Sequence, residues 1–214
     1  YSDTKQLDKS GTQVSENMQL TLKGQNHPWV SRGGIKLNHG LEHFHFNVEN
    51  TTCLDIGAST GGFSDVLLSR GAHKVYAVDV GHGQLDWKIR NNERVVVLEK
   101  FNARYITRNE VPDDIDFICC DTSFIGLSTV LPASMQLSNT TTKLIALIKP
   151  QFEVHKNQVG KKGVVRDPEL HREVCHRILS WIEKFIDWEV LGIEQSPITG
   201  PKGNIEFLIG AKRK

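Results

Sequence analysis

The sequence has no long hydrophobic run: no stretch approaches the roughly 18 apolar residues of a membrane-spanning helix. It also has no marked excess of charge of either sign, because 26 Lys and Arg stand against 25 Asp and Glu and the formal net charge is +1. Bulk charge therefore does not attach the chain to nucleic acid, and any such binding depends on a local basic patch. No signal peptide is recognisable, so we expect a cytoplasmic protein that does not bind membranes.

The four cysteines form no C-x-x-C pair, and three of them, Cys53, Cys119 and Cys120, fall in apolar segments that we expect to be buried strands. This pattern is typical of reduced core residues in a cytosolic protein. The nine histidines are scattered, and His43 and His45 lie two residues apart with no third ligand nearby in the sequence. We therefore expect no metal site.

One glycine is missing from a nucleotide-binding type of loop. An apolar segment containing Asp55 runs into the small-residue loop 57–62, as in the first strand–loop–helix unit of a nucleotide-binding α/β domain. A G-x-G-x-x-G pattern starting at Gly57 would need glycine at position 59, which is Ser59. That glycine lets the backbone approach a pyrophosphate, so a dinucleotide is disfavoured. S-adenosylmethionine (SAM), which has an adenosine but no phosphates, is the cofactor that we expect.

Asp79 supports this expectation. It ends a predicted strand 24 residues after Asp55, where a carboxylate can accept both ribose hydroxyls of an adenosine. It could also be an ordinary acid at a strand end. The complete set of expected cofactor-binding residues is Asp55, Gly57, Ala58, Ser59, Thr60, Gly61, Gly62, Phe63, Asp79, Asn102 and Asp121.

Strands and helices alternate along most of the chain. We expect strands near 52–56, 74–79, 94–99, 115–120, 143–148, 187–194 and 204–211, and helices from 31 and near 62–70, 84–91, 125–137 and 168–186. Continuously apolar strands indicate cover on both faces, which is typical of a parallel sheet, whereas the last two strands follow each other without a helix. The sequence thus predicts an α/β chain with a Rossmann-like SAM-dependent methyltransferase fold. Its seven-stranded sheet should be mainly parallel, with an antiparallel last strand.

The 214 residues suffice for one large domain and a short appendage. We expect the domain to cover residues 29–214. Residues 1–28 are polar and turn-rich, are too few to bury a core, and contain one alternating segment at 18–22 that could form a short strand.

Charged residues stand near the expected ligand site, since open α/β sheets bind ligands beyond the carboxyl ends of their strands. Asp121 follows the fourth predicted strand and Lys149 the fifth, whereas Glu206 stands on the last strand and Lys36 on the first helix. These two lysines and two acids would satisfy one another if they converge. Taken alone, Lys36 is more typical of a solvated helix lysine, and Glu206 could point outward into solvent.

Such a cluster suits methyl transfer to a hydroxyl of low acidity, for example a ribose 2′-hydroxyl. The hydroxyl must lose its proton as it attacks the methyl carbon, and a lysine accepts a proton only in its neutral form, which burial beside a second lysine favours. The two acids would hold the lysines in place. The rest of the catalysis would be in-line positioning against the sulfonium.

Six segments, in order along the chain, resemble the TlyA family of hemolysin A-like proteins with an FtsJ-type RNA methyltransferase domain. They are 29–37 (WVSRGGIKL), 55–63 (DIGASTGGF), 121–124 (DTSF), 149–153 (KPQFE), 159–163 (VGKKG) and 203–207 (GNIEF). The resemblance runs from about residue 9 to the end of the chain. It implies SAM-dependent 2′-O-methylation of ribosomal RNA (rRNA), with rRNA or a ribosomal subunit as the partner. It also implies a Lys-Asp-Lys-Glu catalytic set, which falls on Lys36, Asp121, Lys149 and Glu206.

The resemblance further implies a small N-terminal RNA-binding domain, of which residues 1–24 resemble only the last strand. We therefore expect residues 1–28 to be the remnant of such a domain together with a linker. A basic loop that contains Lys156, Lys161, Lys162 and Arg166 follows the end of the fifth predicted strand. It could contact RNA phosphates there, although clusters of basic residues are usually solvated surfaces. The predicted RNA-binding residues are Arg32, Lys156, Lys161, Lys162, Arg166 and Lys202.

Three other functions compete with this prediction. A hemolysin-type cytolytic protein, which the family's name suggests, is opposed by the lack of a signal, of a membrane-length segment and of a strongly basic amphipathic helix. A non-catalytic SAM-binding module for RNA or ribosome assembly would not need the four charged residues. A small-molecule O-methyltransferase usually carries extra substrate-covering segments, and none is evident. The target nucleotide, the ribosomal subunit and the oligomeric state stay open.

Overall fold

The computed structural model describes residues 13, 15, 17, 18, 27–185 and 187–214. The strands are β1 Thr52–Ile56, β2 Lys74–Val78, β3 Val95–Leu98, β4 Ile115–Cys120, β5 Ser138–Ile148, β6 Trp188–Gln195 and β7 Phe207–Arg213. The α-helices are α1 Gly33–His43, α2 Gly62–Ser69, α3 Trp87–Arg90, α4 Leu127–Met135, α5 Pro150–Glu153 and α6 Pro168–Ile182. The short strand expected over 18–22 and most of the predicted appendage 1–28 lie outside the described residues.

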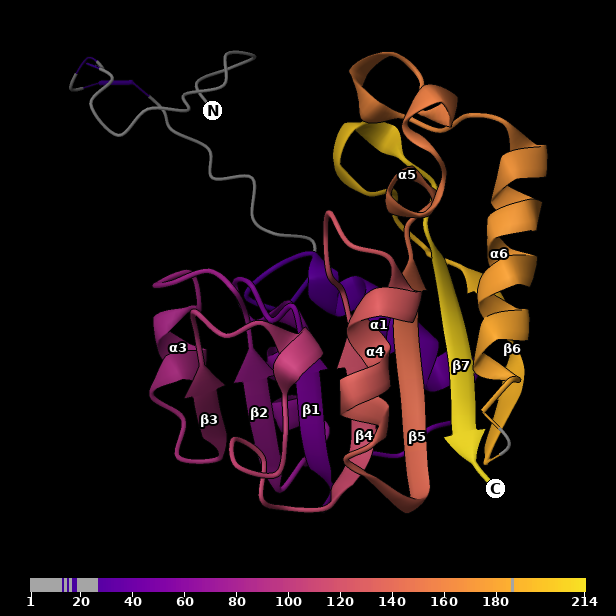
Figure 1. The fold of residues 1–214 in the computed structure, drawn as a ribbon. Helices are drawn as coiled ribbons and strands as arrows, with labels where there is room; N and C mark the ends of the chain where they lie inside the picture. Colours follow the sequence, from indigo (N-terminus) through magenta and orange to yellow (C-terminus); the bar gives the residue numbers. More distant parts are fainter. Residues whose placement is uncertain (1–12, 14, 16, 19–26, 186) are drawn as a thin grey trace.

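All seven strands form one sheet in the order β3-β2-β1-β4-β5-β7-β6 (Figure 1). Neighbouring strands are parallel, except that β7 runs antiparallel to both β5 and β6. The predicted fold class is therefore confirmed. From β1 the chain moves outward to β2 and β3 and then returns to β4 on the other side of β1. Open α/β sheets bind ligands at such a reversal, beyond the carboxyl ends of the strands.

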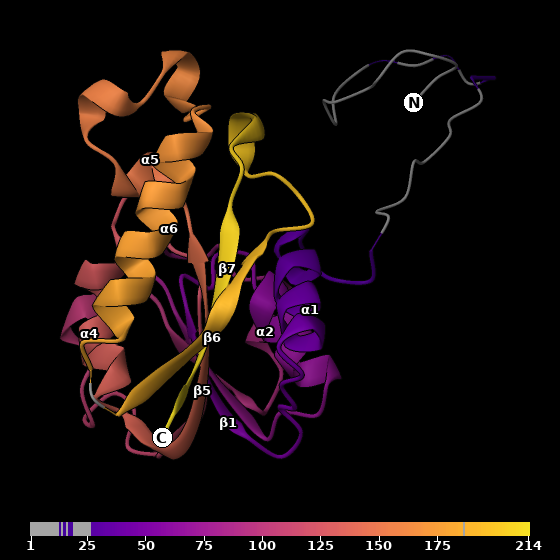
Figure 2. The same cartoon turned by 90° about the vertical axis from the view of Figure 1, so that its right-hand side faces the viewer.

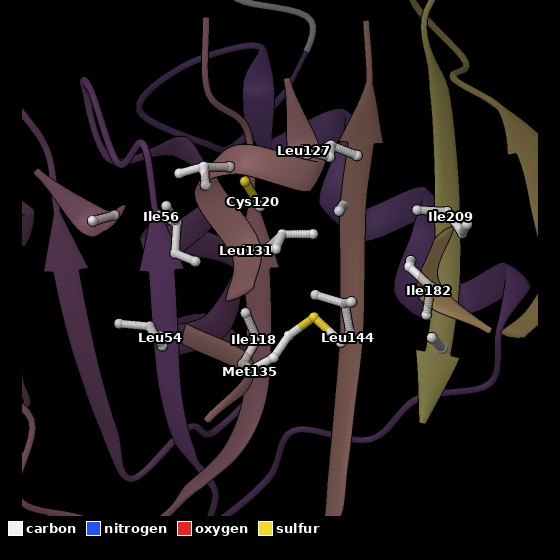
Figure 3. Packing of buried hydrophobic residues seen from close by; sticks show 14 of the residues in the cluster. Leu54, Ile56, Ile118, Cys120, Leu127, Leu131, Met135, Leu144, Ile182 and Ile209 are labelled. Atoms are coloured by element: carbon white, nitrogen blue, oxygen red, sulfur yellow. The ribbon is translucent and has the colours of Figure 1, made fainter. Parts of the chain in front are cut away.

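Helices cover both faces of the sheet, with α1 and α2 on one face and α4 and α6 on the other (Figure 2). Side chains of one strand alternate between the two resulting cores. Along β4, Ile118 and Cys120 pack with Leu131 of α4 (Figure 3), whereas Phe117 and Cys119 pack on the side of α1 and α2. Because both faces are buried, the strand is apolar throughout, as the sequence indicates.

Two element boundaries differ from the predicted ones where polar residues take part. β5 begins at Ser138 rather than at 143, because Ser138 pairs with Ile115 and the hydroxyl of Thr142 donates to the carbonyl of Ile115 across a register shift. α3 begins only at Trp87, since the carboxylate of Asp86 accepts a hydrogen bond from the backbone N–H of Lys88 and caps the helix there. Hydrophobic periodicity does not predict either boundary, because both depend on hydrogen bonds of polar residues.

The cysteines are free thiols, as predicted, and the three strand cysteines are buried. Within the described ranges, no helix combines the length and the apolar character that crossing a membrane requires.

Candidate active site

Two adjoining cavities open beyond the carboxyl ends of the central strands. The larger encloses about 630 Å³ and the smaller, which reaches α1 and the end of β5, about 270 Å³. Gly57, Ser59, Asp121 and Ser123 line both. A wider hollow of about 840 Å³ along α6 contains none of the predicted site residues. The predicted residues thus gather at the reversal point of the sheet.

The loop after β1 is small because two other segments lie directly against it. Gly57 has a φ of +83°, and a Cβ atom there would lie 2.8 Å from the carbonyl oxygen of Asp121. A Cβ atom on Gly62 would overlap the hydroxyl of Ser31 and come within 3.0 Å of the backbone nitrogen of Gly34. The glycines therefore allow the end of β4 and the start of α1 to close on the loop.

Asp79 lies on the wall of the larger cavity. Its Oδ2 accepts a hydrogen bond from the backbone N–H of Ser59 at 2.8 Å, and its Oδ1 accepts one from Gly81 at 2.7 Å. These bonds fix the carboxylate, and each oxygen retains capacity to accept from one of two vicinal ribose hydroxyls. The apolar side chains of Val80 and Ile125 line the same cavity and suit an adenine ring. The residues present therefore fit an adenosine-containing cofactor.

The other predicted cofactor residues divide between the cavity walls and the surrounding packing. Asn102 lines the larger cavity, where its Oδ1 also caps the 3₁₀ helix η1 Ala103–Tyr105 by accepting from the backbone of Arg104 at 3.1 Å. Ala58, Gly62 and Phe63 line the smaller cavity. Thr60 and Gly61 line neither cavity.

Asp55 is fully buried between β1 and α2 and lines neither cavity. Its Oδ2 accepts a hydrogen bond from the hydroxyl of Ser64 at 2.6 Å. Burial raises the pKa of the Asp55 carboxyl to about 7, although the Ser64 bond opposes that rise. Asp55 thus links β1 to α2 through Ser64 and holds the two ends of the loop 57–61 in place.

Four charged side chains converge beside the smaller cavity. Lys36 Nζ donates to Glu206 Oε2 at 2.6 Å and lies 3.7 Å from Asp121 Oδ2. Lys149 Nζ forms an ion pair with the other Asp121 oxygen and donates to Ser123 Oγ at 3.3 Å. Lys36, Lys149 and Glu206 are only 5%, 7% and 1% exposed. The alternative that Lys36 and Glu206 are solvated is therefore wrong.

The four charges compensate one another. Asp121 lies between the two lysines, and Glu206 pairs with Lys36, so the buried cluster is close to neutral. Such compensation is what allows ammonium and carboxylate groups to be buried at all. The arrangement places the two lysine side chains at the wall of the smaller cavity, next to the larger one, where a lysine in its neutral form can accept a proton from a bound hydroxyl.

Comparison with known proteins identifies the family that carries this arrangement. A family model described as FtsJ-like methyltransferase matches residues 29–213, which include all four charged residues. The chain belongs to that family. The matched range contains all six segments on which the resemblance rests.

Three relatives illustrate the similarity to FtsJ-like proteins. The 16S/23S rRNA (cytidine-2′-O)-methyltransferase TlyA of Mycobacterium tuberculosis is 45% identical over 202 residues, which cover 94% of this chain and 75% of that protein. Hemolysin A of Brachyspira hyodysenteriae is 46% identical over 187 residues, covering 86% of this chain and 77% of that protein. A solved structure from Streptococcus thermophilus that carries a hemolysin name has a TM-score of 0.85 and 41% identity, covering 97% of this chain and 75% of that one. The resemblance to the TlyA family is confirmed.

In this FtsJ-like chain, the turn between β6 and β7 positions the carboxylate of Glu206. Glu206 directly precedes β7, whereas the sequence placed it on the strand. Its backbone carbonyl accepts from Ser196 at 2.9 Å, which fixes the residue across the hairpin. Its side chain then occupies the space where Gly200 lacks a Cβ atom. The role of Gly200 could not be predicted from the sequence, because the Gly200–Pro201 pair indicates only a turn. The role of Ser64 could not be predicted either, because no local pattern links its hydroxyl to Asp55.

Gly200→Ala should abolish most turnover while leaving SAM affinity unchanged, because the new methyl group would overlap Glu206 Oε1 and displace the carboxylate from Lys36. Steady-state rates and calorimetric SAM binding would measure the two effects. Gly192→Ala is the matched control, since it strains the same hairpin at a φ of +151° but meets nothing within 4 Å. Equal losses of turnover in both variants would mean that general hairpin destabilisation, not Glu206, is responsible.

The predicted RNA-binding cations are exposed, and Arg32 lies at the smaller cavity. Arg32 lines that cavity and donates to the carbonyl of Thr199 at 3.2 Å. The basic loop and the β6–β7 turn are joined by Asn204, whose side chain donates to Gly163 O at 3.0 Å and accepts from Val165 N at 3.1 Å. The other cations are Lys156 on η2 (Lys156–Gln158), Lys161 and Lys162 on η3 (Lys161–Gly163), Arg166, and Lys202 on η4 (Pro201–Gly203). Over the part of the chain that the structure describes, none of these six cations forms an ion pair with a carboxylate.

Proposed function

We propose that this chain transfers a methyl group from SAM to ribose 2′-hydroxyls of rRNA. The observation that carries the proposal is the convergence of Lys36, Asp121, Lys149 and Glu206 beside the smaller cavity, next to the larger cavity that Asp79 lines. A methyltransferase for a more acidic group would not need two buried lysines held by two acids. A module that only binds SAM would not need the cluster either.

The cofactor would be held by residues of the larger cavity and of the loop after β1. Asp79 would accept the ribose hydroxyls, Asn102 would lie beside the adenine, and the loop 57–63 would surround the methionine portion. When bound, SAM supplies an electrophilic methyl group on a sulfonium. Gly57 and Ser59 line both cavities, so the loop would also set the distance between cofactor and substrate.

The chain's own residues would manage the proton of the attacking hydroxyl. Lys149 is the proposed base, because its amine is held at the cavity wall by Asp121 and Ser123. Lys36 would position the hydroxyl and share Asp121 with Lys149. Glu206 does not line the cavity and would act by holding Lys36.

The substrate is proposed from the names of relatives together with the basic surface. The M. tuberculosis relative is named as an rRNA cytidine-2′-O-methyltransferase. The exposed cations Arg32, Lys156, Lys161, Lys162, Arg166 and Lys202 give this chain groups that could contact the phosphates flanking a target ribose. A protein that acts on this substrate would work in the cytoplasm. Residues 1–28 would belong to a second RNA-contacting module, and 29–214 would form the catalytic domain.

Methyl transfer from labelled SAM to rRNA that lacks the modification tests this function. The phosphodiester bond on the 3′ side of the labelled nucleotide should resist alkaline hydrolysis, because a 2′-O-methyl ribose cannot form the cyclic phosphate intermediate. After mapping, an RNA with 2′-deoxyribose at that position should accept no label. Label on a base, or label on small phenols and not on rRNA, would contradict the proposal. Lysis of erythrocytes by purified protein would instead support the cytolytic alternative.

Replacing Lys156, Lys161 and Lys162 together by alanine should weaken rRNA binding and leave SAM binding unchanged. If each lysine contacts one phosphate, the slope of log affinity against log salt should become shallower by about 0.7–0.9 per lysine. Filter binding over a salt series would measure this slope. Lys184→Ala, which changes an exposed lysine just beyond the far end of α6, is the control. If the slope of log affinity against log salt is the same for the triple variant and the wild type, the basic loop is an ordinary solvated surface.

A further inference from the structure

His39, His43 and Glu194 form a side-chain cluster outside the active site. The two histidines are four residues apart in the last turns of α1, so they share one helix face. Their rings are stacked with centroids 6.1 Å apart and an interplanar angle of 29°. Glu194 comes from β6, 155 residues after His39 in the sequence. The proposed methyl transfer uses none of these residues.

The distances between the potential ligand atoms fit a shared cation, although His39 Nε2 and Glu194 Oε1 also form a long hydrogen bond. His39 Nε2 lies 3.4 Å from Glu194 Oε1, and His43 Nδ1 lies 3.8 Å from Glu194 Oε2. Both exceed the usual range of about 2.7–3.2 Å for a nitrogen–oxygen hydrogen bond. Two atoms that each lie about 2.0–2.2 Å from a tetrahedral zinc ion are roughly 3.4 Å apart. One potential ligand atom from each residue lies within 4.8 Å of the others, so small side-chain rotations would complete the set.

We propose that His39, His43 and Glu194 bind one divalent cation of the zinc type. Two imidazoles and one carboxylate are a ligand set that zinc accepts, and two histidines four apart on a helix are a recurrent way to present it. The three side chains are 35%, 42% and 35% exposed, which leaves one side of the site open for a water ligand. The acid beside His43 does not compete, because Glu42 is paired with Arg70.

The position of the site suggests a structural role. His39 follows Lys36 by one turn of α1, and β6 is hydrogen-bonded to β7, which Glu206 precedes. A cation would therefore cross-link the helix that carries Lys36 to the hairpin that places Glu206. A hydrolytic role is disfavoured, since the residue after the first histidine is Gly40 and not the glutamate that serves as base in H-E-x-x-H sites.

Zinc titration of the tag-free, chelator-treated full chain tests this site. Calorimetry should give one Zn²⁺ per chain, and Zn²⁺ should raise Tm by several degrees. Co²⁺ should give visible absorption bands typical of a tetrahedral site. His43→Ala and Glu194→Gln should each weaken zinc binding at least tenfold and remove the Tm shift, while their metal-free Tm stays near that of the wild type.

His176→Ala is the matched control, because His176 is also an exposed helix histidine and should keep full zinc binding. The absence of saturable zinc binding to the wild type would overturn the proposal. Binding that persists undiminished in both His43→Ala and Glu194→Gln would overturn it as well. Neither outcome bears on methyl transfer, which rests on different residues.

Discussion

Lys149→Ala should abolish methyl transfer, with a loss on the order of 10²–10⁴-fold, while SAM affinity stays nearly unchanged. The amine of Lys149 is buried beside Asp121 and Ser123 at the wall of the smaller cavity and does not line the larger one. Its removal therefore takes away the proposed base and leaves the adenosine site intact. Single-turnover rates with rRNA and calorimetric SAM binding would separate the two quantities.

Two further variants sharpen this test. Lys149→Arg retains the positive charge but cannot accept a proton at accessible pH, so it should be as inactive as the alanine variant. Lys143 lies on β5, the strand that directly precedes Lys149, and its amine lies 5.5 Å from the centre of the Phe46 ring, so Lys143→Ala should keep full turnover. Substantial activity in Lys149→Arg would show that the residue supplies charge and not a base, and full activity in Lys149→Ala would remove Lys149 from the mechanism.

Asp79→Ala should weaken SAM binding by about 1–3 kcal/mol, which corresponds to roughly 5- to 150-fold in Kd. The substitution removes a fixed charged acceptor from two ribose hydroxyls and also frees the backbone N–H groups of Ser59 and Gly81 that shape the cavity. Isothermal calorimetry with SAM or its demethylated product would measure the change.

Asp86→Ala is the matched control for the Asp79 variant. The Asp86 carboxylate also accepts from a backbone N–H, that of Lys88 at 2.8 Å, but it lines neither cavity. SAM affinity should therefore be unchanged in Asp86→Ala. Unchanged affinity in Asp79→Ala, or tighter binding of NADH than of SAM to the wild type, would contradict the cofactor assignment.

Most of the sheet was predictable from the sequence because its signals are local. Continuous apolar runs marked strands buried on both faces, and the small-residue loop after Asp55 marked the first strand–helix turn. The strand-end rule then placed Asp79, Asp121 and Lys149 at one edge of the sheet without any structural knowledge. The polar first half of β5 could not be predicted from hydrophobic periodicity, because side-chain hydrogen bonds of Asn139 and Thr142 to β4 hold it against that strand.

The fold class, the small-residue loop after β1 and the family could be predicted from the sequence, since each depends on short segments whose pattern is complete within a few residues. Which distant charges meet depends instead on the tertiary structure. Lys36 and Glu206 are 170 residues apart. They pair because β7 lies between β5 and β6, which places Glu206 beside the first turn of α1. The same hairpin brings Glu194 to His39 and His43. Such convergence depends on strand order, which local sequence patterns do not encode, and burial of the Lys36–Glu206 pair then requires each charge to find its partner.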